Sequence, residues 1–154
     1  MNRLTTGRNA LTDRLAVISP SNGYLTTAGS NVRTGWFNEV ITSNESGFPL
    51  IVVQRGKGKP PEQGAGAIRA YPCFNVIGAV DAGLDGYEDA LDDIELDLLT
   101  CLMPSGGQFV EWAKGMGITG FTLGASEHYP PGNGERAASV LIPVYLHTVI
   151  TSGE

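Results

Sequence analysis

Apolar residues recur at three- and four-residue steps in two stretches of the chain, and this spacing predicts two amphipathic helices. The first covers residues 8–18, with apolar positions continuing a stripe that starts at Leu4. The second runs from about 85 to 103, where Asp85 is placed to cap the first turn and Pro104 to end the helix. Its apolar stripe consists of Leu84, Tyr87, Leu91, Ile94, Leu98 and Cys101.

Four other stretches have the composition or alternation of strands. Residues 48–55 are apolar on both faces and predict a central strand, followed by a strand over 67–80 in which Pro72 indicates an edge position or a bulge. Residues 119–129 predict a further strand, and residues 136–151 predict a long closing strand. The closing strand presents to one side Ala138, Val140, Ile142, Val144, Leu146 and Ile150.

The remaining segments are less regular. Residues 24–27 and 32–37 are β-prone and predict a short hairpin or an ordered loop, and residues 108–115 predict one or two helical turns. Residues 55–66 are rich in glycine and proline and cannot bury enough apolar surface to order themselves, so we expect a long, mobile loop there. Residues 130–134 predict a turn.

These elements predict a single α+β domain over residues 1–154. We expect a mainly antiparallel sheet of four to five strands, packed against an N-terminal helix and a central acidic helix. The 21 glycines among 154 residues argue against a helical bundle, and no apolar stretch approaches the length of a membrane span. The N-terminus lacks the apolar core of a secretory signal, and two cysteines are too few for a disulfide framework, which indicates a reduced, cytoplasmic folding compartment.

Charge divides the chain into unlike halves. Residues 1–69 carry eight of the ten lysines and arginines against four acidic residues, whereas residues 70–154 carry twelve acidic residues against two basic ones. Copies of such a chain can pair head to tail, although charged runs are more often simply solvated. If they do pair, the candidate interface residues are Arg55, Lys57, Lys59, Arg69, Asp89, Asp92, Asp93 and Asp97, the last four expected on the outer face of the second helix.

The sequence offers little that indicates catalysis. His128 and His147 are the only histidines, and they lack the spacing of a metal site; the acidic residues of the second helix lack the glycine turn of a calcium loop. Cys73 and Cys101 lie in apolar stretches without a neighbouring base, which favours buried, inert thiols. We therefore expect no enzymatic activity, no catalytic residue, no cofactor and no metal.

The order of these elements resembles that of the tail terminator, or tail tube completion, proteins of long-tailed bacteriophages. The resemblance covers most of the chain. It rests on the N-terminal helix, the strand Phe-Pro-Leu-Ile-Val-Val at 48–53 with the segment after it, the acidic helix at 87–99 and the closing strand at 138–150.

The resemblance implies a virion structural protein that forms a ring, hexameric in that family, on the completed tail tube. Such a ring terminates tube polymerisation and offers the surface that joins the head. The implied partners are further copies of the chain, the tail tube protein and head–tail connector or neck proteins. DNA passes through the lumen without specific binding, no membrane is involved, and the location is the head-proximal end of the tail after assembly in the host cytoplasm. Another connector or neck protein remains an alternative, as does a small α+β ligand-binding domain or enzyme.

Overall fold

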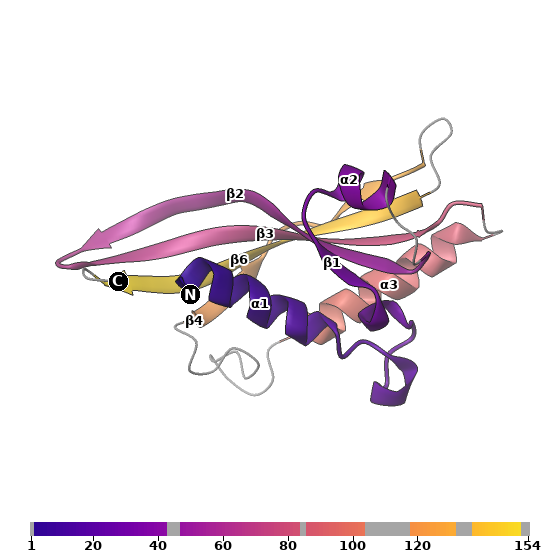
Figure 1. Ribbon diagram of the computed structural model, residues 1–154, viewed down its shortest axis with the longest axis horizontal. Helices are drawn as coiled ribbons and strands as arrows, with labels where there is room; N and C mark the ends of the chain where they lie inside the picture. The colour runs from indigo at the N-terminus through magenta and orange to yellow at the C-terminus, as the bar shows by residue number, and fades with distance from the viewer. Residues whose placement is uncertain (1, 43–46, 84–85, 104–117, 132–136, 152–154) are drawn as a thin grey trace.

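The computed structural model describes residues 2–42, 47–83, 86–103, 118–131 and 137–151. Its centre is a six-stranded sheet with the order β1-β2-β3-β6-β4, in which β5 also pairs with β6 (Figure 1). Only the β1–β2 pair is parallel. The strands are β1 (Val32–Thr34), β2 (Leu50–Gly64), β3 (Ala67–Asp81), β4 (Ile118–Leu123), β5 (Glu127–Tyr129) and β6 (Ala137–Thr151). The predicted α+β architecture is confirmed, with one strand more than expected.

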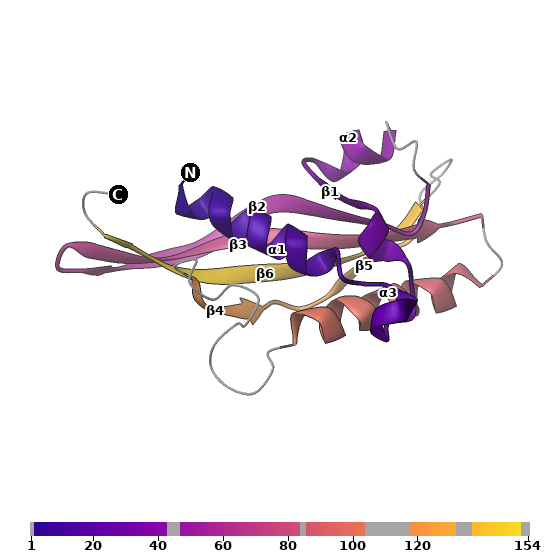
Figure 2. The same ribbon diagram turned by 60° about the horizontal axis from the view of Figure 1, so that its bottom comes forward.

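Helices cover both faces of the sheet, but unequally. Helix α1 (Arg3–Leu15) and helix α3 (Tyr87–Leu102) pack on one face and enclose the main core. The short helix α2 (Phe37–Thr42) lies on the other side of the sheet from α3 (Figure 2). Two short 3-10 helices, η1 (Pro20–Asn22) and η2 (Ala28–Ser30), connect α1 to β1. Within the described part of the chain, no helix is long and apolar enough to cross a membrane.

The main core follows the predicted alternation of β3 and β6. Phe74 and Val76 point to the helices together with the even-numbered residues of β6 from 138 to 146, and all of these are buried. Arg14 and Cys101 join the two helices, since the Arg14 Nε donates to the Cys101 carbonyl at 2.9 Å and the Cys101 thiol donates to the Arg14 carbonyl at 3.3 Å. The absence of a side chain at Gly78 lets α3 approach β3, because a Cβ there would lie 3.0 Å from Ile94 Cδ1.

The largest difference from the sequence prediction is the hairpin of β2 and β3. The loop expected over 55–66 is wrong, because β2 continues to Gly64 and a two-residue turn at 65–66 leads directly into β3. Gly66 has a φ of 71°, which suits glycine in such a turn. The prediction fails because the segment does not order itself: β3, which also pairs with β6, supplies its backbone partners.

The pairing within this hairpin is irregular where glycine and proline occur. The register shifts between Gly56 and Lys59 and again between Lys59 and Glu62, and Pro72 lies opposite the first shift. A bulge near Pro72 is therefore confirmed, whereas an edge position is not, since β3 lies between β2 and β6. At Gly58 a Cβ would lie 2.5 Å from the Tyr71 carbonyl oxygen, so only glycine fits the bulge without a backbone shift.

Several smaller predictions differ from the structure in detail. Of the two alternatives for residues 24–27 and 32–37, the hairpin is wrong: 24–27 form a loop, and of 32–37 only β1 is a strand, which pairs in parallel with β2. The strand expected over 119–129 is broken into β4 and β5. Helix α3 begins after Gly86, whose left-handed backbone replaces the expected side-chain cap. Asp85, the segment 108–115 and most of the 130–134 turn lie outside the described residues.

Candidate functional site

The candidate basic residues gather on one projecting element. We call residues 54–71, which form the distal parts of β2 and β3, the basic hairpin; it extends beyond both packed helices (Figures 1 and 2). All four predicted basic residues are exposed on it: Arg55, Lys57, Lys59 and Arg69. The structure therefore brings together side chains that span fifteen positions of the sequence.

Two of these cations lie over aromatic rings on opposite faces of the sheet. The Lys59 Nζ is 4.5 Å from the centroid of the Tyr145 ring, and the Arg55 Cζ is 5.0 Å from the centroid of Phe74. Such cation–π contacts contribute about 0.5–1 kcal/mol at exposed sites. They hold two positive charges close to the root of the hairpin.

A row of polar aromatic side chains continues from Lys59 along the face opposite α3. The rings of Tyr71 and His147 meet edge to face at 5.1 Å, and the His147 Nε2 lies 2.8 Å from the Thr122 hydroxyl on β4. The Tyr71 hydroxyl donates to Glu62 at 2.6 Å, and this hydrogen bond raises the pKa of Tyr71. The row ties β2, β3, β6 and β4 together where no helix covers the sheet.

His147 makes the stability of this row depend on pH. Burial, followed by the positive charges of Lys59 and Arg69, lowers the pKa of His147 below its ordinary value of 6.5. As the pH falls, His147 is therefore protonated in the unfolded chain before it is protonated in the folded chain. We expect the free energy of unfolding to decrease with falling pH, from about pH 6.5 to the pKa of His147 in the folded state. Urea unfolding between pH 7.5 and pH 5 measures the decrease, and an NMR titration of the ring locates the folded-state pKa.

The matched control for this prediction is the second histidine. His147→Gln should remove the contribution of the His147 ring to the pH dependence, whereas His128→Gln should leave that contribution in place. A pH dependence that is the same in His147→Gln as in the parent chain would contradict the assignment.

The acidic helix presents three of the four predicted carboxylates to solvent. We call Asp89, Asp92 and Asp93 the acidic face; all three are exposed on α3. The helix begins at the end of the molecule opposite the tip of the basic hairpin (Figure 1). Among the described residues the two charged groups are thus separated along the long axis instead of neutralising each other.

Asp97, the fourth carboxylate, is buried, so its predicted position on the outer face of the helix is wrong. Only 2% of Asp97 is exposed, and its carboxylate accepts hydrogen bonds from the backbone amides of Leu25 and Thr26, at 2.9 and 2.8 Å, and from the Thr26 hydroxyl at 2.7 Å. Position 97 follows Ile94 by three residues and precedes Cys101 by four, so it lies at the margin of the apolar stripe. The prediction placed it outside because spacing alone does not reveal the segment that folds over it.

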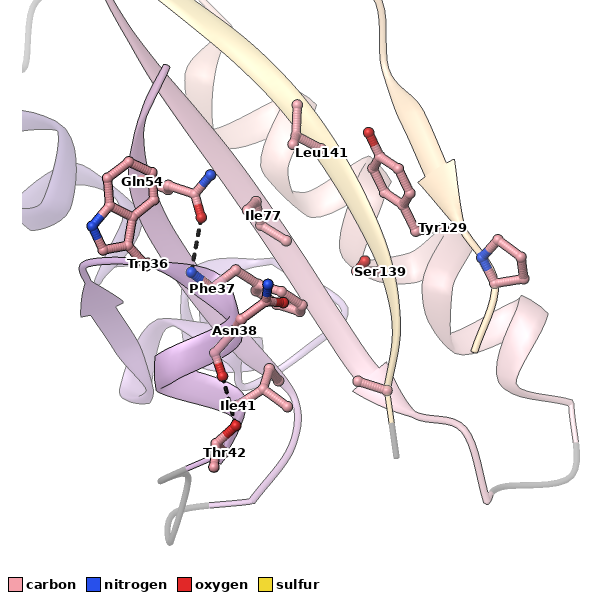
Figure 3. Close-up of a pocket in the computed structure, with 12 residues that line it drawn as sticks. Trp36, Phe37, Asn38, Ile41, Thr42, Gln54, Ile77, Tyr129, Ser139 and Leu141 are labelled. Carbon is pink, nitrogen blue, oxygen red and sulfur yellow. Dashed lines mark hydrogen bonds between the residues drawn. The ribbon is translucent and has the colours of Figure 1, made fainter. Parts of the chain in front are cut away.

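A groove lies on the sheet face opposite α1 and α3. It has a volume of about 860 Å³ and lies between α2 and β5, with Ile77 of β3 and Leu141 of β6 in its floor. Figure 3 shows Trp36 and Tyr129 on opposite sides of these strands; 57% of Trp36 and 46% of Tyr129 are exposed. None of the groove's lining residues within the described ranges is charged.

The polar groups at the groove are largely engaged within the protein. The Gln54 side-chain oxygen accepts a hydrogen bond from the Phe37 amide at 2.8 Å and so anchors the start of α2 (Figure 3). The Tyr129 hydroxyl donates to the Glu127 carboxylate, and this bond raises the pKa of Tyr129. The groove therefore offers aromatic and apolar contact area with few groups for acid–base chemistry.

The sequence analysis does not find this groove. A continuous strand over 119–129 would place Tyr129 on the same face as Phe121, but in the structure Phe121 pairs with Leu146 on the helix-covered face and Tyr129 pairs with Ser139 on the other. The break between β4 and β5 resets the alternation, since Gly124 donates to the Pro143 carbonyl at 2.8 Å between them. The adjacent aromatic residues at 36 and 37 are the one signal in the sequence that could have indicated an exposed apolar surface.

The histidines and cysteines take up other positions. His128 lies within hydrogen-bond distance of Glu95 and joins β5 to α3. Cys73 and Cys101 are free thiols, both buried as predicted, and burial raises the pKa of each. Among the residues that the structure describes, no group of three histidine, cysteine or acidic side chains is placed to hold a metal ion.

Compared with protein-family models and with curated protein sequences, the chain matches none.

Proposed function

We propose that this chain is a virion structural protein of a long-tailed bacteriophage: a tail terminator that forms a ring on the tail tube, ends its polymerisation and provides the surface that joins the head. The proposal rests on the resemblance in element order. The partners are other copies of the chain, the tail tube protein and the connector or neck proteins. DNA passes through the lumen without specific binding.

The observation that carries the proposal is the separation of charge along the molecule. The basic hairpin projects at one end, and α3, which carries the acidic face, begins at the other (Figure 1). Closed rings need heterologous contacts, in which one surface of a subunit meets a different surface of the next. Opposite charges at opposite ends favour head-to-tail encounter and disfavour contact between like ends.

The edges of the sheet are compatible with such contacts. Strand β1 pairs with β2 only over residues 51–53, so the outer edge of β2 beyond Gln54 has no strand partner within the described ranges. Exposed strand edges are sites at which another chain can add. The central sheet therefore leaves surface for neighbours on the side of the basic hairpin, although Pro60 and Pro61 interrupt the backbone N–H donors of β2.

Two alternatives lead to different expectations. Another head–tail connector would form a ring that binds adaptor proteins instead of tube protein. A small enzyme or ligand-binding domain requires a pocket with convergent polar groups and perturbed acids or bases. The groove favours neither an enzyme nor a charged ligand, because the lining that the structure describes carries no charge and because Gln54 and Tyr129 are engaged within the protein.

Charge reversal of the acidic face tests the proposal. We expect the triple variant Asp89→Lys, Asp92→Lys and Asp93→Lys to raise the concentration at which rings form by about tenfold, since exposed ion pairs contribute about 0–1 kcal/mol each. Sedimentation velocity measures the assembly, negative-stain images reveal rings, and a tail-joining assay with isolated tubes and heads measures the function.

The control is an exposed carboxylate elsewhere. Asp13 on α1 is exposed, and Asp13→Lys should leave assembly unchanged. The single variant Asp92→Lys, which makes the same change of charge on the acidic face, should weaken assembly. Adding Lys57→Glu and Lys59→Glu to the triple variant should restore part of the lost assembly if the two ends meet. Unchanged assembly and joining in the triple variant would mean that the acidic face is only solvated.

A further inference from the structure

The groove has the lining of a binding site for an extended, uncharged peptide segment. Its exposed aromatic side chains, Trp36 and Tyr129, flank an apolar floor that includes Ile77 and Leu141. Aromatic-lined grooves of this kind bind proline-rich segments, whose backbone is already extended and whose rings pack flat against the aromatic faces. The volume of about 860 Å³ lies within the range of pockets that hold ligands of several residues.

The chain itself carries a segment of the matching chemistry. Pro60 and Pro61 lie on β2 within the basic hairpin, and both are exposed. Proline fixes an extended φ and has no backbone N–H, so this segment presents apolar rings on a pre-ordered backbone. The tip of the hairpin lies at the end of the sheet away from α2, which borders the groove (Figure 1). A copy therefore cannot fill its own groove.

We propose that the basic hairpin of one copy docks into the groove of the next, with Pro60 and Pro61 between Trp36 and Tyr129. This inference rests on the proposed function, since it names the contact through which copies join. Charge complementarity supports a second copy as the occupant. Lys59 directly precedes the two prolines, and Glu127 lies beside Tyr129 at the groove. The acidic face lies towards the same end of the molecule, on the other side of the sheet.

A contact of this kind has a direction. The donor surface, the hairpin, and the acceptor surface, the groove, are different parts of one molecule, so each copy can accept one neighbour and dock onto another. Apolar burial in the groove supplies the affinity that exposed ion pairs lack, while the charges orient the encounter. High salt should therefore slow association more than it weakens the docked state.

Complementation between two variants tests the docking. Pro60→Ala with Pro61→Ala removes the donor and keeps the groove; Trp36→Ala with Tyr129→Ala removes the groove and keeps the donor. We expect each variant to need at least about tenfold higher concentration to assemble than the parent chain. An equimolar mixture should form a one-to-one dimer that does not grow, because it contains a single intact contact. Sedimentation velocity measures this, and circular dichroism establishes that both variants fold.

The outcomes separate this inference from the proposed function. Rings that persist in both variants, or a mixture of folded variants that stays monomeric while the parent assembles, overturn the docking and leave the ring in place. A parent chain that stays monomeric overturns the ring.

If the parent chain stays monomeric, the fluorescence of Trp36 tests the docking directly. In a Trp112→Phe chain, Trp36 is the only tryptophan. A synthetic peptide of residues 57–63 should then shift its emission to shorter wavelengths, whereas the same peptide with alanine at 60 and 61 should not. An unchanged spectrum with the proline peptide overturns the docking.

Discussion

Replacing Asp97 by alanine is expected to lower the free energy of unfolding by about 2–4 kcal/mol. The carboxylate is buried and satisfies two backbone amides and a hydroxyl at residues 25–26, where the chain folds over α3. Hydrogen bonds to a charged group contribute about 1.5–3 kcal/mol, and a buried donor left without an acceptor costs about 1–3 kcal/mol. Urea denaturation of Asp97→Ala at pH 7 measures the loss.

Two further variants isolate the cause. Asp97→Asn keeps one accepting oxygen but turns an amide NH₂ towards the donors, so we expect an intermediate loss. Asp93→Asn, on the exposed part of the same helix, should change stability by less than about 0.5 kcal/mol. Equal stability of Asp97→Ala and Asp93→Asn would contradict the structural role given to Asp97.

Replacing Phe74 by alanine is the second change with a large expected effect, a loss of about 3–5 kcal/mol in the free energy of unfolding. Phe74 is 1% exposed and lies in the main core on β3, with the Arg55 guanidinium over its ring. The truncation removes apolar burial, leaves a cavity and deprives Arg55 of its cation–π partner. Denaturant unfolding followed by circular dichroism measures the loss.

The comparison variants for Phe74 are Phe74→Leu and Leu96→Ala. Leucine keeps much of the buried volume and should cost about 1.5 kcal/mol or less. Leu96 lies on α3 with 55% of its surface exposed, so its truncation should be nearly neutral. If the Phe74→Ala chain is as stable as the Leu96→Ala chain, the prediction is wrong, because the core would then close around position 74 without a loss in the free energy of unfolding.

The sequence predicts best the elements that pack against one core along their whole length. The alternation along 136–151 gives the buried face of β6, because the even-numbered residues from 138 to 146 all belong to the main core that α1 and α3 enclose. The apolar stripe from Leu91 to Cys101 correctly predicts the buried side of α3 for the same reason. Both patterns record a single continuous core, which is the property that hydrophobic periodicity measures.

The failures arise where a segment depends on a partner distant in sequence. The outer part of β2 has no apolar pattern of its own and is a strand because β3 pairs with it. Asp97 has the spacing of a solvated carboxylate but receives donors from residues 25–26. The groove combines Trp36, Tyr129 and the floor strands, which no local pattern places side by side. The four basic candidate residues are exposed, and the sequence could identify them because the charge of a side chain does not depend on a packing partner.

The two prolines of β2 also affect how readily other chains can add to the outer edge of this strand. A long strand whose outer edge lacks a neighbour among the described residues is a template on which nascent or partly folded chains can add indefinitely. Pro60 and Pro61 leave two consecutive positions of β2 without an N–H donor, and the register shifts on either side of Lys59 mark bulges, which twist a strand. The distal part of this edge is therefore a poor template for the continuous addition of further strands.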